Sequence, residues 1–165
     1  MNERNVSDRS VMINLAIVVG LLAAVVIGVL VFVAPKFEGE GYAVARGQAI
    51  YNANCASCHG ADLQGAENWQ VQGEDGSYPA PPHNGDGHTF HHPDSMLIDY
   101  IKRGGAVVLA EMGVDSVKSG MPAFGDVLDD GEIANVLDYI KSTWPEEARA
   151  NQARLTAADE AAGGS

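Results

Sequence analysis

The sequence predicts a mainly α-helical protein, with one N-terminal membrane-spanning helix followed by a small helical domain. Residues 11–34 form a long apolar run, and three later segments repeat their apolar residues with helical spacing. No segment alternates apolar and polar residues over a length useful for a strand. The chain has 165 residues, so we expect about 100 of them to fold around one core.

The apolar run from Val11 to Ala34 contains one polar residue, Asn14. As a helix, its 24 residues would be about 36 Å long, which is enough to cross a bilayer. A cleaved signal peptide would be shorter and would end in a small-x-small site, which this run lacks. We therefore expect an uncleaved anchor over residues 11–34, with residues 1–10 before it and a short linker over residues 35–41.

Small residues recur every four positions along this run, at Ala16, Gly20, Ala24 and Gly28. In a helix they form one stripe, the kind of surface on which membrane helices approach closely. We expect a partner helix there, although Gly and Ala are also frequent in membrane helices that lack one.

Two helices are predicted early in the remaining chain. The first covers residues 42–54 and places Gly47 and Tyr51 on one face. The second begins near Pro93, a residue suited to the first turn of a helix, and stops at Gly104.

The third helix has the clearest signals. Asp129 and Glu132 have the spacing of a capping box, and apolar residues follow at i, i+3, i+4 and i+7 until Trp144. These apolar residues are Ile133, Val136, Leu137 and Ile140. In the polar tail over residues 145–165, we expect a polar helix from Glu146 to Leu155 and disorder from Thr156 onward.

Net charge is −12, and after Pro35 the chain has 20 Asp and Glu against 8 Lys and Arg. Such an acidic domain would repel the phosphates of nucleic acid, so nucleic acid is not an expected partner. A basic redox protein is the kind of partner that this charge would attract.

The most specific motif is CxxCH at residues 55–59. Cys55 and Cys58 can add across both vinyl groups of one haem, and His59 then becomes an axial ligand of the iron. These are the only cysteines, so thioether bonds would leave no thiol for a disulfide, a zinc site or nucleophilic catalysis. We expect one covalently bound haem c, a chance match or a redox CxxC being the alternative.

Haem attachment also decides the expected orientation, because Arg4 and Arg9 before the anchor and Lys36 after it give a weak charge signal. Haem c is attached outside the cytoplasm in bacteria. We therefore expect a single-pass protein of the bacterial inner membrane, with the N-terminus inside and the haem domain in the periplasm.

Residues 42–144 resemble a class I c-type cytochrome, a fold of three main helices and loops around one covalent haem. The resemblance rests on the first helix, the CxxCH, a proline-rich loop, a SGMPAFG segment and the end of the last helix. It implies that the first and last helices cross closely at Gly47. It extends to a membrane-anchored monohaem subgroup with a PAPPH loop followed by GHTWHH, here residues 79–83 and 87–92 with Phe90 in place of the tryptophan.

Met121 is the predicted second axial ligand. It lies in the SGMPAFG segment, where a thioether can be presented to the far face of the haem, 62 residues after His59. Met112 and a loop histidine are the alternatives. A His/Met pair leaves no open coordination site, so we expect transfer of single electrons and no small-molecule substrate.

The resemblance implies that a backbone carbonyl of the proline-rich loop, that of Pro81 or alternatively Pro82, accepts a hydrogen bond from the ligating imidazole. Trp69, Tyr78 and Phe90 are expected to cover the haem. The long insert over residues 62–86 has no assigned role.

Four histidines gather in the loop, at His83, His88, His91 and His92. They are expected to pack over the haem edge or bond its propionates, with a copper or zinc site as the alternative.

The expected function is therefore that of a membrane-anchored periplasmic electron carrier between respiratory or photosynthetic redox complexes, and not that of an enzyme. One alternative is a permanent haem c subunit of a membrane oxidoreductase whose catalysis resides on another chain. A weaker alternative, based on the histidines alone, is a redox or metal sensor.

Overall fold

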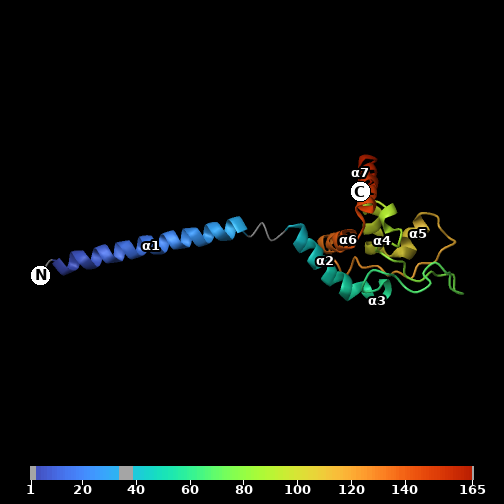
Figure 1. Cartoon of the computed structure of the whole chain (residues 1–165), viewed down its shortest axis with the longest axis horizontal. Helices are drawn as coiled ribbons and strands as arrows, with labels where there is room; N and C mark the ends of the chain where they lie inside the picture. The colour runs from blue at the N-terminus through green and yellow to red at the C-terminus, as the bar shows by residue number, and fades with distance from the viewer. Residues whose placement is uncertain (1–2, 34–38, 165) are drawn as a thin grey trace. The chain divides into compact units, whose positions relative to one another are not determined.

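The computed structural model describes residues 3–33 and 39–164, in two compact units that comprise residues 1–42 and 43–165. The first unit contains one long helix, α1 (Glu3–Val33) (Figure 1). Within α1, the exposed segment Val11–Val29 has a mean hydropathy of 2.7, so its length and composition allow it to cross a membrane. Ala34 and residues 35–38 of the expected linker lie outside the described residues.

The second unit is mainly helical, as predicted. The helices that follow α1 are α2 (Glu40–Asn54), α3 (Ala56–His59), the 3₁₀ helix η2 (Thr89–His91), α4 (Asp94–Arg103), α5 (Gly105–Glu111), α6 (Asp130–Ser142) and α7 (Glu146–Ala161) (Figure 1). Over residues 3–33 and 39–164, the only β-type pairing is an isolated bridge between Ser77 and Lys118.

The core is built on α6, whose N-terminus has the predicted capping box. The Asp129 side chain accepts a hydrogen bond from the backbone of Glu132, and the Glu132 side chain accepts one from the backbone of Asp129. The buried residues of α6 form the centre of two apolar clusters. The first cluster comprises Tyr51, Leu63, Val136, Tyr139, Ile140 and Trp144. The second cluster comprises Ile101, Leu128, Ile133 and Leu137.

Helix α2 crosses α6 at Gly47, where the two backbones nearly touch. A Cβ atom on Gly47 would lie 1.8 Å from the backbone oxygen of Asn135 and 3.0 Å from the Cβ of Tyr139. Farther along α2, the ring centroids of Tyr51 and Tyr139 are 5.4 Å apart. The expected close crossing at Gly47 is therefore confirmed, and only a residue without a side chain permits it.

Helix α4 begins at Asp94 with Pro93 as its N-cap, and it ends at Arg103, where the C-cap residue Gly104 has a φ of +81°. Helix α5 has no clear signal in the sequence. This helix has seven residues and buries only Gly105 and Val108. It is therefore too short for its apolar residues to show a helical repeat in the sequence.

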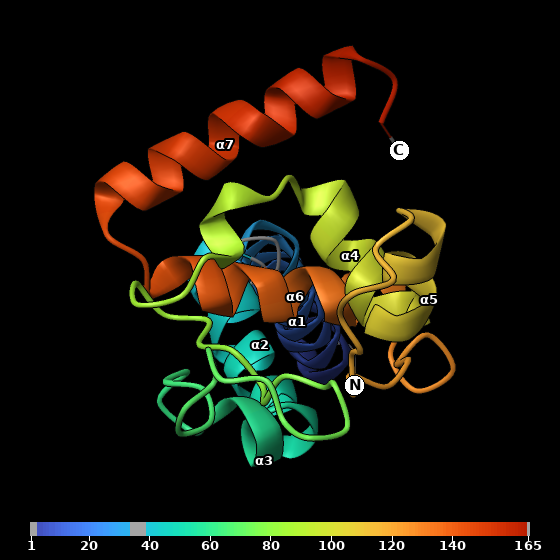
Figure 2. The same cartoon turned by 90° about the vertical axis from the view of Figure 1, so that its right-hand side faces the viewer.

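The tail differs from the prediction, because α7 continues to Ala161 and residues 156–161, expected to be disordered, are helical. The hydroxyl oxygen of Thr156 accepts a hydrogen bond from the backbone N–H of Asp94 at 3.1 Å, and Ser95 donates one to Asp159 at 2.6 Å. The buried amide of Gln152 donates to Asp94 Oδ1 at 2.6 Å. These polar contacts hold α7 against α4, which lies between α6 and α7 (Figure 2). The spacing of apolar residues in the sequence does not predict such polar contacts.

We predict that Gly47→Ala lowers the free energy of unfolding of the haem-loaded protein by about 3 kcal/mol, because the new Cβ meets backbone that cannot move aside. The matched control is Gly41→Ala, in the same helix but with no atom within 4 Å of the new Cβ. It should be neutral or stabilising by up to about 1 kcal/mol. Denaturant titration of both variants measures their free energies of unfolding. Equal free energies in the two variants would contradict the close crossing at Gly47.

Candidate functional site

The CxxCH residues lie on a single helical turn. Helix α2 ends at Asn54, Cys55 is the N-cap of α3, and the backbone N–H groups of Cys58 and His59 donate to the Cys55 carbonyl at 3.1 and 3.0 Å. Residues three and four positions apart on a helical turn share a face, so both sulfur atoms and the imidazole belong to one side of this turn.

Both cysteines are free thiols, with Cys55 half-buried and Cys58 exposed. Burial, with a smaller contribution from the nearby Cys58, raises the pKa of Cys55 to about 11. Cys55 is therefore uncharged at neutral pH, and its surroundings favour an uncharged sulfur atom such as that of a thioether.

His59 is buried, with 8% of its surface exposed, and the carbonyl group of Pro81 holds its ring. Nδ1 of His59 lies 2.8 Å from the Pro81 oxygen. A carbonyl can only accept, so Nδ1 carries the proton and Nε2 is left free to bind a metal. Burial lowers the pKa of His59, and the bond to Pro81 opposes this shift, so the ring is neutral at pH 7. Of the two candidate prolines, Pro81 makes the contact.

Two glycines with no distinctive sequence pattern allow the proline loop to approach closely. A Cβ atom on Gly65, which has a φ of +74°, would lie 2.5 Å from the backbone nitrogen of Pro82. One on Gly87 would lie 2.1 Å from the Pro82 oxygen. The N–H of His83 also donates to the Leu63 carbonyl at 2.8 Å. A glycine in a loop is the only sequence signal of these contacts, and many loops share it.

His83 lies directly against His59. The ring centroids are 4.1 Å apart and the ring planes are inclined by 23°, so the two imidazoles stack. Nδ1 of His83 lies 2.9 Å from the hydroxyl of the buried Thr89, and the His83 carbonyl accepts a hydrogen bond from Nε1 of Trp144 at 2.7 Å. Burial, followed by the charges of His59 and His88, lowers the pKa of His83 to about 3, so its ring is neutral.

The other three histidines make different contacts. His88 stacks on Trp69 at 6.1 Å and meets His92 edge-on at 5.6 Å, while His91 is exposed beside Phe90. Among the residues that the structure describes, no group of three or more His, Cys, Asp and Glu could hold a metal ion. The copper or zinc alternative therefore has no support in this part of the chain.

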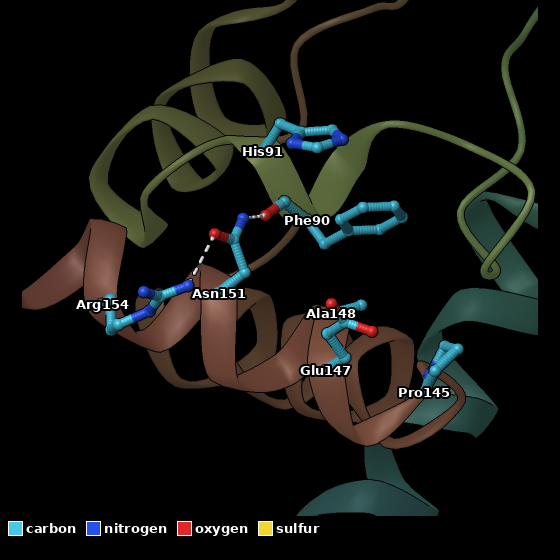
Figure 3. A pocket seen from close by; sticks show the side chains of 7 residues that line it. All are labelled: Phe90, His91, Pro145, Glu147, Ala148, Asn151 and Arg154. Atoms are coloured by element: carbon cyan, nitrogen blue, oxygen red, sulfur yellow. Dashed lines mark hydrogen bonds between the residues drawn. The ribbon is translucent and has the colours of Figure 1, made fainter.

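A groove between η2 and α7 lies beside this histidine segment, and Figure 3 shows the residues that line it. They are Phe90, His91, Pro145, Glu147, Ala148, Asn151 and Arg154. The groove contains none of the CxxCH residues and not Met121. Phe90, an expected haem cover, places its ring edge-on against Trp144 at 5.9 Å, beside the first apolar cluster.

Met121 is half-buried in the loop between α5 and α6, where it packs against the second apolar cluster. Its N–H donates to the Ser119 hydroxyl at 3.2 Å, and its carbonyl accepts from the Gly105 N–H at 3.1 Å. A Cβ atom on Gly104 would lie 3.1 Å from the Met121 oxygen, so glycines at the α4–α5 junction let the loop approach. The competing Met112 is 54% exposed at the end of α5.

Comparison with known proteins gives several matches. A family model for cytochrome c matches residues 44–144. Cytochrome c6 of Diacronema lutheri is 30% identical over 103 residues, which cover 60% of this chain and 94% of that protein. The cbb3-type cytochrome c oxidase subunit CcoP of Azospirillum sp. (strain B510) is 32% identical over 97 residues, 59% of this chain and 27% of that subunit. Cytochrome c-555 of Prosthecochloris aestuarii is 52% identical over 31 residues, 19% of this chain and 31% of that protein. No solved structure matches at comparable significance.

A small helical domain that presents two thiols and a neutral imidazole on one turn is suited to covalent attachment of haem. The chain belongs to the cytochrome c family. The expectation of a class I c-type cytochrome is thereby confirmed, and membership implies covalently bound haem c and a function in electron transfer.

We predict that Gly65→Ala pushes the Pro81–Pro82 backbone away from His59. The protein should lose about 3 kcal/mol of unfolding free energy, and its reduction potential should shift, because both backbone strain and overlap result. Gly113→Ala is the matched control, with a similar φ of +70° but no atom within 4 Å of the new Cβ. It should cost about 1 kcal/mol and leave the potential unchanged. A redox titration and a denaturant titration compare the two variants.

Proposed function

We propose that Cys55 and Cys58 hold one haem c through thioether bonds and that His59 and Met121 are the axial ligands of its iron. The observation that carries this proposal is the hydrogen bond from His59 Nδ1 to the Pro81 carbonyl at 2.8 Å, which leaves Nε2 for a metal. The shared turn of the CxxCH residues supports the same assignment.

Each of the two ligand segments packs against one of the two apolar clusters. Cys55 and Ala56 pack against the first apolar cluster, and Met121 packs against the second. Ile50 of α2 contacts both clusters. A haem held from both sides would place most of its apolar surface against the core, which favours the folded state.

A haem held in this way would supply one-electron redox chemistry, and His59 and Met121 would be the ligands that tune its potential. The neutral His59, oriented by Pro81, and the thioether of Met121 would fill both axial positions and favour a comparatively positive potential. No position is then left for a substrate, so the protein transfers electrons without transforming a small molecule.

We further propose that the protein is anchored in the bacterial inner membrane by residues 11–34, with residues 42–144 forming a cytochrome domain in the periplasm. The apolar segment Val11–Val29 supports the anchor, and the chemistry of haem c attachment supports the orientation. The protein would carry electrons between respiratory or photosynthetic complexes. Its PAPPH and GHTFHH segments support membership of the anchored monohaem subgroup.

A second candidate is a permanent haem c subunit of a membrane oxidoreductase. It is favoured by the similarity to the CcoP subunit of a cbb3-type oxidase, of which this chain covers 27%. The small-residue stripe of α1, at Ala16, Gly20, Ala24 and Gly28, supports the same candidate, because small residues let membrane helices approach each other closely.

Ligation by Met121 is tested by Met121→Ala. The ferric protein should lose the weak absorption near the red end of the spectrum that a thioether–iron bond produces, and its potential should fall. Met112→Ala, which removes an exposed methionine, should keep both properties. Retention of the band and the potential in Met121→Ala would refute the ligand assignment.

Electron transfer to a basic redox protein should slow as ionic strength rises. After Pro35 the chain has 20 acidic and 8 basic side chains, and the basic residues Arg46, Lys102, Arg103 and Lys141 each pair with a carboxylate. The remaining acidic groups give this part of the chain a negative electrostatic field. Exposed charges are screened over about 8 Å at physiological salt. Stopped-flow rates with a basic acceptor, compared with an uncharged small reductant, measure this effect. A rate independent of salt would point to an apolar docking surface.

The double substitution Gly20→Leu and Gly28→Leu should separate the two candidate functions. In a permanent subunit it would hold neighbouring helices apart and release partner proteins on a native gel after gentle extraction, with haem content unchanged. Val18→Leu with Val26→Leu is the control, since these positions lie off the stripe. An unchanged complex size in both variants would favour the mobile carrier.

A further inference from the structure

His83 is the one histidine of the loop that touches the proposed haem site, and the proposed chemistry gives it no role. Its ring lies 4.1 Å from that of His59, centroid to centroid, at an angle of 23°. His88, His91 and His92 make no such contact with a site residue; their ring partners are Trp69, Phe90 and each other.

We propose that His83 is a positioning residue that fixes the plane of the His59 imidazole and thereby tunes the potential of the haem. The inference rests on the proposed ligation of the iron by His59.

One hydrogen bond does not fix the plane of a ligating ring. The bond from His59 Nδ1 to the Pro81 carbonyl holds one edge of the ring, but a carbonyl oxygen accepts over a broad range of directions. A flat ring stacked on the face of His59 removes the remaining tilt and rotation, because any turn would drive the two rings into each other.

Three hydrogen bonds hold His83 in the position from which its ring stacks on His59. Its Nδ1 bonds the hydroxyl of Thr89, a side chain with 8% exposure, at 2.9 Å. Its backbone N–H donates to Leu63 at 2.8 Å, and its carbonyl accepts from Trp144 at 2.7 Å. An aliphatic residue would fill the same volume, but it would have neither a flat face nor a bond to Thr89.

The plane of an axial imidazole affects the iron directly. Its orientation decides which iron d orbitals overlap with the ring's π system, and this sets the g values of the ferric haem in electron paramagnetic resonance. The ligand environment also contributes to the reduction potential. A change of plane should therefore be visible in both measurements, even when both axial ligands are kept.

The test uses the full-length, haem-loaded protein in detergent and compares His83→Leu with wild type. We expect unchanged haem content and unchanged thioether absorption, together with shifted g values and a shifted potential. The control is His91→Leu, which removes an exposed imidazole of the same segment and should change neither. Wild-type g values and potential in His83→Leu would overturn the proposal.

Thr89→Val provides a second test that leaves both imidazoles in place. It removes the hydroxyl that holds His83 with little change in volume, and it should shift the g values in the same direction by a smaller amount. If His83→Leu yields no haem-loaded protein, this variant decides, and unchanged g values in it would overturn the proposal.

His59→Ala distinguishes this inference from the proposal on which it depends. Loss of imidazole ligation in His59→Ala, with ligation kept in His83→Leu, supports the proposed role of His59 as ligand, and the g values of His83→Leu then decide the positioning role of His83. Imidazole ligation that survives in His59→Ala but disappears in His83→Leu would make His83 the ligand and overturn both.

Discussion

The hydrogen bond between His59 and the Pro81 carbonyl is the contact around which the rest of the site is arranged. It fixes the tautomer of a buried, neutral imidazole, and it requires the proline loop to lie against the turn that carries the two cysteines. That approach is possible only because Gly65 and Gly87 have no side chain where Pro82 passes. A small change in the loop would therefore alter the ring that we propose as an iron ligand.

The proline loop is in turn fastened to the core. The side chain of Trp144, at the end of α6, donates to the carbonyl of His83, while its ring belongs to the first apolar cluster. Helix α6 meets α2 at Gly47, and α2 leads directly into the CxxCH turn. The site is thus supported at both ends by one pair of crossing helices, and such rigid support suits an electron-transfer protein.

Outside the core, polar contacts hold α7 against the rest of the domain. Gln152 is 3% exposed and bonds Asp94, and together with Thr156 it keeps α7 on the segment that leads from the histidine loop into α4. Buried polar groups are stabilising only when they are paired, and these are. The acidic surplus remains on the surface, where it can direct encounters with a partner without disturbing the apolar packing.

By itself the sequence determined the parts of this protein that local patterns encode. Apolar content located α1, the three- and four-residue spacing located α2, α4 and α6, and the pair Asp129 and Glu132 placed the start of α6, because each signal acts within a few turns of one helix. The CxxCH marked the haem segment for the same reason. Only the tertiary structure decided that α7 extends to Ala161, that Gly65 and Gly87 position Pro81, and that His83 stacks on His59. These features depend on contacts between residues up to 64 positions apart in the sequence. Local patterns in the sequence do not show which of these residues come into contact.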